Sequence, residues 1–390
     1  MNLFLTKIKG DKLIWAVVFI FTIVSLLAVY SSTGTLAYKY HGGNTEYYML
    51  KHAIILFFGL VLMYLAHLVK YTYYSRIFQI ILYLAVPLLL VTLLFGQTIN
   101  EASRVLYIPG LGLTFQSSDL AKITLIIYLA RVLSKKQEKI KDFKSAFVPL
   151  LVPVLLVCGL ILPANFSTAA ILFTISIVLM FVGRVKMSYI LGMVGIGIVA
   201  LSIALLVLYL MPVEEQGRLG TWKNRISAFT SGEGGDNYQV EQSKIAIATG
   251  GVVGKMPGNS TQRNFLPHPY SDFIFAIIIE EYGFLGGAFI IFLYMLLFYR
   301  IVIIVVRAPG TFGSLLVVGV GFALVFQAMI NMGVAVNILP VTGQPLPLLS
   351  MGGTSIWFTS LSIGIILSVS KELARDKEES EQYQTDIVHA

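Results

Sequence analysis

The sequence is poor in charge and has almost no cysteine. Asp, Glu, Lys and Arg make up 12% of its 390 residues, whereas a soluble domain carries about 25%. The single cysteine, Cys158, lies inside an apolar run, which excludes an intramolecular disulfide and a cluster of thiolate metal ligands. Basic stretches interleaved with aromatic residues are also missing, so we expect no nucleic-acid partner.

Apolar residues dominate the composition instead. They account for 57% of the chain, and the mean hydropathy is +0.82, so most of the chain is expected to face lipid. Crossing a bilayer takes a helix of about 17–25 apolar residues. Ten stretches are candidates: 13–33, 52–69, 77–95, 118–133, 146–163, 168–183, 188–210, 272–299, 311–335 and 353–370. We therefore predict an all-α integral membrane protein with ten transmembrane helices.

The ten stretches predict a single polytopic domain over residues 1–370. The charged segment 371–390 is expected to form a disordered cytoplasmic tail. The first apolar stretch is longer than the core of a signal peptide and has no cleavage site, so we expect it to be retained. The stretch at 118–133 is the weakest, because Asp119 and Lys122 lie in its first turn, and it is kept because the charge distribution requires it.

Basic residues gather in alternate short loops. One side of the membrane collects most of them, whereas the short loops on the other side hold Lys39, Lys51 and Arg104. Because Lys and Arg favour cytoplasmic loops, both termini are expected in the cytoplasm. The net charge of +8 then adds affinity for anionic headgroups. A long loop at 211–271, between the seventh and eighth spans, lies outside the cell membrane, and its stretch "YQVEQSKIAIATGG" predicts a short helix on the membrane surface.

The eighth apolar stretch carries three acidic residues. "FLPHPYSDFIFAIIIEEYG", residues 265–283, places Asp272 at its start and Glu280 and Glu281 in its middle. On a continuous helix Glu280 lies roughly 12 Å deeper than Asp272, and Glu281 points to nearly the opposite side, so the acids cannot form a catalytic carboxylate pair. Asp272, at the water boundary, fits a helix cap and a catalytic group equally well. A charge is costly at the depth of Glu280 and Glu281, so both should face the bundle interior, paired or protonated, in a structural or pathway role.

The loop and helix start in "NEASRVLYIPGLGLTFQSSDLAKI", residues 100–123, carry a second group of charges. Asp119 and Lys122 are three residues apart, on one helix face, and are expected to form an ion pair. Arg104 stands alone in the outer loop. It offers a fork of donors for a phosphate or carboxylate, or it rests as an interfacial side chain.

A third stretch, "NILPVTGQPLPLLSMGGTS" at residues 337–355, cannot form a continuous helix. It contains three prolines and three glycines, and non-helical backbone at membrane depth is tolerated only where protein or a water-filled cavity covers it. We therefore expect it to line a cavity. Its residues with a structural or pathway role are Pro340, Gly343, Pro345, Ser350, Gly352 and Gly353.

In this order the motifs "FQSSDLAK", "YQVEQSKIAIATGGVVGK", "LPHPYSDFIFAIIIEEYGFLGG" and "LPVTGQPLPLLSMGGTS" resemble the SEDS family, the RodA and FtsW peptidoglycan glycosyltransferases. The resemblance covers essentially the whole chain. It implies a ten-span fold and a multi-pass protein of the bacterial cytoplasmic (inner) membrane that polymerises lipid II, the undecaprenyl-diphosphate disaccharide-pentapeptide, into glycan strands. "PGNSTQRNFLP" resembles the division branch and "PVTGQPLP" the elongation branch; division is favoured.

The resemblance also implies roles for single residues. Asp272 matches the acidic residue of the family's His-Thr-Asp-Phe-Ile-Phe segment, which implies that it is the catalytic acid-base group. Tyr270 stands where the family has His, so the imidazole of that histidine is missing here, and Ser271 keeps the hydroxyl of the family's Thr. Met351 replaces the usual aromatic residue before Gly352.

Joining two sugars at an anomeric carbon that bears a diphosphate calls for a base and for positive charge. Inversion needs one base on the face opposite the leaving group, and Asp272 is our candidate. Arg104, Lys244 and Arg263 are candidates for holding the diphosphate, with Gln242 and Ser271 as further substrate contacts. The alternative for the cations is loop solvation. No covalently bound cofactor is expected. A divalent cation, Mg²⁺ or Mn²⁺, is a candidate for helping to neutralise the diphosphate. The lipid tail needs an apolar groove between spans.

Two other functions compete with the enzyme. A lipid II flippase or transporter would use Glu280, Glu281 and the broken last motif as its pathway. A non-catalytic scaffold would recruit a penicillin-binding protein through its spans and outer loop. The family resemblance implies that a class B penicillin-binding protein transpeptidase and other divisome or elongasome membrane proteins are partners of the polymerase, so the enzyme and scaffold roles coexist.

Overall fold

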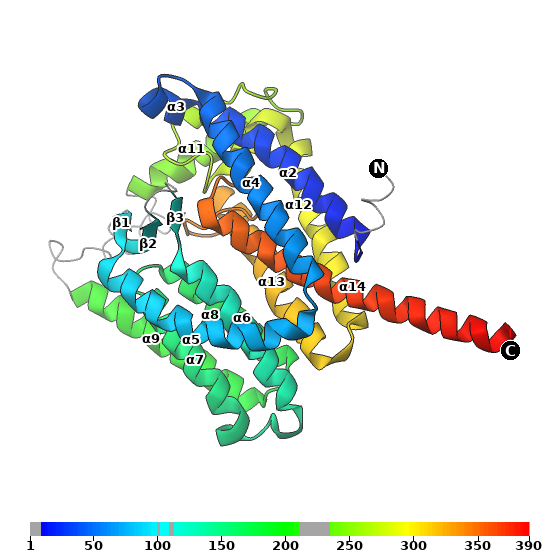
Figure 1. Cartoon of the computed structure of the whole chain (residues 1–390). Coiled ribbons are helices and arrows are strands. Elements are labelled where there is room, and N and C mark those ends of the chain that lie inside the picture. Colours follow the sequence, from blue (N-terminus) through cyan, green and yellow to red (C-terminus); the bar gives the residue numbers. More distant parts are fainter. Residues whose placement is uncertain (1–8, 100–101, 109–112, 211–234, 390) are drawn as a thin grey trace.

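The computed structural model describes residues 9–99, 102–108, 113–210 and 235–389, and most of them are helical (Figure 1). The helices are α2 (Lys12–Ser32), α3 (Gly34–His41), α4 (Thr45–Leu68), α5 (Tyr71–Phe95), α6 (Ser117–Lys135), α7 (Val148–Ile161), α8 (Phe166–Val182), α9 (Met187–Leu210), α11 (Gly235–Gly250), α12 (Ile274–Arg307), α13 (Gly310–Ala335) and α14 (Gly353–His389). Short 3-10 turns at Gln137–Lys139 and Gln262–Asn264 and a π turn at Phe143–Phe147 complete the helical elements.

A helix overlaps each of the ten predicted apolar stretches. Within the described residues, seven helices are long and apolar enough to cross a membrane: α2, α4, α5, the π turn joined to α7, α12, α13 and the first part of α14. Two more, α8 and Met187–Ile203 of α9, are apolar but shorter. The chain is therefore a multi-pass membrane protein.

Contacts between distant segments define two ends of the helix bundle. At one end Asp11 caps α2 through the N–H groups of Leu13 and Ile14 and pairs with Arg300 near the end of α12, at 2.5 Å. At the other end of α2, the Ser31 carbonyl accepts a hydrogen bond from Arg263 at 2.9 Å. The conspicuous sequence motifs meet at this second end.

A small sheet interrupts the otherwise helical chain. Strands β1 (Gln97–Ile99), β2 (Ala102–Ile108) and β3 (Leu113–Phe115) form an antiparallel sheet in the order β1-β2-β3. The prediction of an all-α chain overlooked it. The alternation in "SRVLYI" and the turn residues that follow are strand and turn signals.

The last helix is longer than expected. α14 continues through residues 371–389, where a disordered tail was predicted, and extends beyond the bundle (Figure 1). Lys, Glu, Gln and Arg are good helix formers, and Glu372 pairs with Arg375 one turn further on, at 2.7 Å, and with Lys70 at 3.3 Å. Local propensity and these ion pairs explain why the helix does not stop at the last apolar residue.

The long loop contains the predicted helix. α11 ends at Gly250, as the Gly-Gly stop signal indicates. Its buried face, with Val240, Ser243 and Ala246, packs on α12 and α13, and the Ser243 hydroxyl donates to the Ala335 carbonyl at 2.7 Å. The helix is thus fixed to the bundle by its small and apolar face. The earlier part of the loop, 211–234, lies outside the described residues.

Candidate functional site

The segment between α13 and α14, residues 336–352, is non-helical, as predicted, and it is mostly buried from residue 341 to residue 350. Side chains from three helices satisfy its carbonyl groups. Gln344 O accepts from Asn331 at 2.8 Å, Pro345 O from Gln327 at 3.0 Å, Pro347 O from Tyr294 at 2.5 Å, and Leu349 O from Ser25 at 2.9 Å. Such internal partners are what irregular backbone in a membrane bundle requires.

This segment holds the backbone around Asp272. The Ser350 hydroxyl donates to the Ser271 carbonyl at 2.6 Å, and the Met351 N–H donates to the Tyr270 carbonyl at 2.8 Å. The Asn331 amide donates both to the Asp272 carbonyl, at 2.9 Å, and to the segment itself. Residues of the stretch 337–355 therefore help to fix the position of the stretch that carries Asp272.

The Asp272 carboxylate does not cap a helix. α12 begins at Ile274, and its N-cap residue is Phe273, which makes no capping hydrogen bond through its side chain. Asp272 is half-buried, and its Oδ1 accepts from the Ser271 hydroxyl at 2.9 Å. Among the described residues Oδ2 has no hydrogen-bond donor, and a Cβ at Gly343 would lie 3.7 Å from it. The carboxylate is thus oriented through one oxygen, while the other is left without a donor among the described residues.

Tyr270 takes the position where the resemblance places a histidine. Burial raises the pKa of the Tyr270 phenol, and the Asp272 carboxylate raises it further. The phenol therefore stays protonated and neutral at physiological pH, and it can donate a hydrogen bond but cannot carry the positive charge of an imidazolium.

The motif at the start of α6 joins the same end of the bundle. The Gln116 N–H donates to Thr354 Oγ1 at 3.2 Å. Asp119 and Lys122 form an ion pair at 3.4 Å, as their spacing predicts, and Lys122 Nζ also donates to Gln327 Oε1 at 2.9 Å. Because Gln327 holds the Pro345 carbonyl, the α6 charges connect to the segment before α14. They also line a cavity of about 30 Å³, enough for a water or two.

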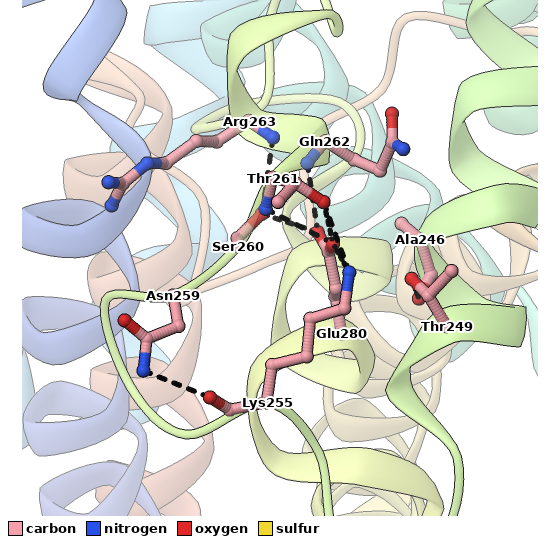
Figure 2. Close-up of polar contacts among 9 residues, drawn as sticks. All are labelled: Ala246, Thr249, Lys255, Asn259, Ser260, Thr261, Gln262, Arg263 and Glu280. Carbon is pink, nitrogen blue, oxygen red and sulfur yellow. Dashed lines mark hydrogen bonds and ion pairs between the residues drawn. The ribbon is translucent and has the colours of Figure 1, made fainter.

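The two glutamates serve other contacts. Glu280 is fully buried and accepts hydrogen bonds from the loop that precedes Asp272 (Figure 2). Glu281 is 1% exposed and accepts from the Ser31 hydroxyl at the end of α2. Both face the interior, as predicted. Glu280 forms an ion pair with Lys255, whereas Glu281 Oε2 has no hydrogen-bond partner among the described residues. Neither contacts Asp272 in the described hydrogen-bond network.

Neither Arg263 nor Lys244, the candidate cations whose side chains are described, forms a hydrogen bond or ion pair with Asp272. Arg263 Nη1 donates to the Ser31 carbonyl at 2.9 Å, so its guanidinium is directed at α2. Lys244 is exposed on α11, and Gln242 on the same helix is half-buried. Arg104 belongs to β2, but its side chain lies outside the described residues. Their contact with a diphosphate stays a prediction.

Several residues that organise this site are polar side chains within apolar helices, a feature that the sequence displays. Asn331, Gln327 and Tyr294 each lie in a long apolar helix and are buried, and a buried polar side chain must find a partner. That rule predicts a polar contact for each. The partner, a carbonyl on a distant segment, depends on the tertiary fold.

The described residues contain no group of three or more His, Cys, Asp or Glu side chains that could hold a metal ion. Mg²⁺ held largely by substrate phosphates needs only one or two protein carboxylates. A preformed protein cage for a cation is therefore not available in this part of the chain.

An apolar cavity of about 430 Å³ lies between α7, α8 and α9. Its walls include Leu155, Cys158, Phe166, Phe173, Val194 and Leu201. The lining is almost wholly apolar, which suits a hydrocarbon chain and gives a polar group no partner.

Comparison with known proteins decides the family. Residues 11–375 match the model of the Cell cycle protein family that comprises FtsW, RodA and SpoVE. The chain belongs to this FtsW/RodA/SpoVE family. The resemblance noted from the motifs is thereby confirmed over almost the whole sequence.

Two relatives illustrate how far this FtsW/RodA/SpoVE protein resembles others in sequence. It is 31% identical over 378 residues to the probable peptidoglycan glycosyltransferase FtsW of Geobacter sp. (strain M18), covering 94% of this chain and 98% of that protein. It is 29% identical over 376 residues to stage V sporulation protein E of Bacillus subtilis (strain 168), again covering 94% and 98%.

Solved structures share the fold of this FtsW/RodA/SpoVE protein. A chain from a peptidoglycan synthase complex, solved in a study of how polymerization and crosslinking are coordinated, superposes with a TM-score of 0.70 at 26% identity, covering 93% of this chain and 98% of that one. RodA of Thermus thermophilus superposes with a TM-score of 0.66 at 24% identity, covering 93% and 97%.

Proposed function

We propose that this protein is a peptidoglycan glycosyltransferase that polymerises lipid II at the outer face of the bacterial cytoplasmic membrane, with Asp272 as the general base. Relatives of matching length carry the name peptidoglycan glycosyltransferase. The observation that carries the proposal for the site is the arrangement of Asp272. Ser271 binds its Oδ1 and Asn331 binds its carbonyl, while Oδ2 has no donor among the described residues.

The reaction follows from this arrangement. Asp272 Oδ2 takes the proton from the 4-hydroxyl of the acceptor sugar while that oxygen bonds to the anomeric carbon of the donor. The bond from the anomeric carbon to the diphosphate breaks, and the diphosphate leaves with the electron pair, inverting the anomeric centre. Ser271 keeps Oδ1 engaged, so the proton goes to Oδ2. Arg104, Lys244 and Arg263 are proposed to neutralise the leaving diphosphate.

The lipid tail of the substrate needs an apolar path. The cavity between α7, α8 and α9 is large enough for a segment of polyprenyl chain and is lined by apolar side chains. We place the tail there, with the diphosphate near the outer ends of these helices. This placement explains why a sugar polymerase is built as a membrane bundle.

Topology and partners are part of the proposal. We propose ten spans with both termini in the cytoplasm and the sheet, α11 and Asp272 outside, because the basic residues cluster at the opposite loops. A class B penicillin-binding protein transpeptidase is the proposed partner, supported by the likeness to a chain of a peptidoglycan synthase complex. A role in division is favoured over elongation, in keeping with the relatives named FtsW.

A divalent cation remains a proposed helper. It would be held largely by the diphosphate and would supply charge neutralisation of the leaving group. The residues of the chain bind, orient and take the proton without it. Removing divalent cations from the assay with a chelator tests whether turnover depends on them.

The flippase alternative requires Glu280 and Glu281 to be protonated and deprotonated in turn during transport. Glu280 is held by an ion pair with Lys255 and by hydrogen bonds from the loop, which weighs against such cycling of its charge. The decisive experiment supplies labelled lipid II to the purified protein with its cognate transpeptidase. Glycan chains are the expected product, whereas passage of lipid II across liposomes without polymer would favour the flippase.

A further inference from the structure

α12 is two helices joined at a break. Gly283 has φ 70° and ψ −171°, which interrupts the helix between Tyr282 and Phe284. The loop after α11 occupies the break: the Phe284 N–H donates to the Gly251 carbonyl at 2.9 Å, and the Lys255 N–H donates to the Glu280 carbonyl at 2.9 Å. The first part of α12, Ile274–Tyr282, is therefore not fixed in direction by the long helix that follows.

Glu280 lies near the end of this first part and binds the loop through its carboxylate (Figure 2). Oε1 accepts from Lys255 Nζ at 2.7 Å, from the Thr261 hydroxyl at 2.8 Å and from the Thr261 N–H at 3.1 Å. Oε2 accepts from the Ser260 hydroxyl at 2.5 Å and from the Gln262 N–H at 3.2 Å. Five donors converge on one fully buried side chain.

These hydrogen bonds close the segment 262–280 into a loop. Gln262 at its start binds the carboxylate of Glu280 at its end, and Asp272 lies near the middle. Fixing the two ends of a loop restricts every residue between them. Ser350 and Asn331 then hold the middle of the segment, at Ser271 and Asp272.

We propose that Glu280 is a positioning residue for the reaction, which closes the segment 262–280 and so fixes the carboxylate of Asp272. The proposal rests on the proposed glycosyltransferase function. A carboxylate buried at this depth is costly unless it is paired, and an apolar side chain at this position would pack without that cost. The carboxylate is explained by the loop it holds, because no neutral side chain accepts from five donors at once.

The test compares wild type with Glu280→Gln in the complex with the cognate transpeptidase, using labelled lipid II. The glutamine has one acceptor oxygen and an amide that faces the Ser260 and Gln262 donors. We expect kcat to fall at least about tenfold with KM within about twofold, because misplacing a catalytic group by 1 Å costs up to about 100-fold in rate. Lys255→Arg keeps the positive charge beside the buried carboxylate and should lose much less.

Hydrogen exchange provides a readout that does not depend on activity. In Glu280→Gln the backbone amides of residues 263–273 should exchange at least about tenfold faster than in wild type, while those of α13 stay unchanged. The matched control is Glu46→Gln, an exposed acid in the first turn of α4 with the same change in charge; it should alter neither quantity.

The outcomes separate the two proposals. Unchanged exchange at 263–273 in Glu280→Gln overturns the positioning role, whatever the enzyme does. Faster exchange with wild-type kcat also overturns it, since closure would then not matter to the reaction. A wild-type complex that makes no polymer contradicts the proposed function, while the exchange data still report whether Glu280 closes the segment. Exchange that also rises across α13 means that Glu280 stabilises the whole bundle, which again contradicts the proposal.

Discussion

At the scale of single residues, Asp272 depends on neighbours that come from far along the chain. Ser271 orients its Oδ1, and Asn331 binds its carbonyl. Asn331 donates at the same time to the carbonyl of Gln344, so one amide joins two motifs that are separate in sequence. Its loss should therefore affect both the fold of the site and the reaction.

We expect Asn331→Leu to lower the free energy of unfolding by about 2–4 kcal/mol, because two buried carbonyl groups lose their donor. Glycan polymerisation by the same variant should fall as the Asp272 backbone shifts. Thermal unfolding of the purified complex and the rate with labelled lipid II measure the two effects. A variant with wild-type melting and rate would show that this amide does not hold the site.

The glycine beside Asp272 provides a second prediction at this scale. Gly343 has φ 64°, and an added Cβ would lie 3.7 Å from Asp272 Oδ2. Gly343→Ala should cost about 1–2 kcal/mol in backbone strain and should slow polymerisation by narrowing the space for the acceptor hydroxyl. Gly42→Ala is the matched control, because Gly42 has φ 59° with open space around it. Equal rates in the two variants would argue against an acceptor at this place.

At the scale of elements, the break in α12 is where sequence reasoning failed most clearly. The apolar run around Glu280 predicts one continuous helix, and the geometry derived for the three acids assumed it. Gly283 was the available signal, since an isolated glycine within a helix pattern indicates a break or a close approach of another backbone. The loop residues Gly250 and Gly254 that fill the break could not be paired with it from sequence, because that contact depends on tertiary packing.

Gly283→Ala should lower the free energy of unfolding by far more than backbone strain alone would. A Cβ there would overlap the Val252 carbonyl of the loop, so the loop would have to leave the break. We expect a loss in the free energy of unfolding well above the roughly 1–3 kcal/mol of strain in this glycine-only backbone region, seen as a lower melting temperature and as protease cleavage after Lys255. Gly310→Ala has a similar φ of 72° with open space, and it should show the strain alone. Similar melting temperatures for the two variants would contradict the close packing.

At the scale of the whole molecule, apolar length made the positions of the helices predictable. A helix overlaps each predicted stretch because a bilayer demands a minimum apolar length, which sequence displays directly. The sheet and the helical extension of α14 were not predicted, because short strand patterns and local helix propensity are weak signals in a sequence. The three stretches were expected to matter, but the fold was required to show that Ser350 and Asn331 hold the backbone at Asp272 and that Gln116 binds Thr354.

The orientation of the chain in the membrane can be tested by labelling introduced cysteines, because the sequence has one native cysteine to remove. Cys158 is buried, so wild type should resist a membrane-impermeant thiol reagent applied to intact cells. In a Cys158→Ala background, Glu46→Cys should be labelled from outside, and Lys139→Cys only after the membrane is opened, because basic loops stay in the cytoplasm. Labelling of position 139 in intact cells would reverse the proposed orientation.

The central claim is that Asp272 is the base of a lipid II polymerase. The most direct test is glycan-chain formation from labelled lipid II by the protein with its cognate transpeptidase, comparing wild type with Asp272→Asn. Asparagine keeps an oxygen to accept from Ser271 but cannot take up the acceptor proton, so we predict folded protein with a rate at least about 100-fold lower. Polymer formed at the wild-type rate by Asp272→Asn would contradict the account.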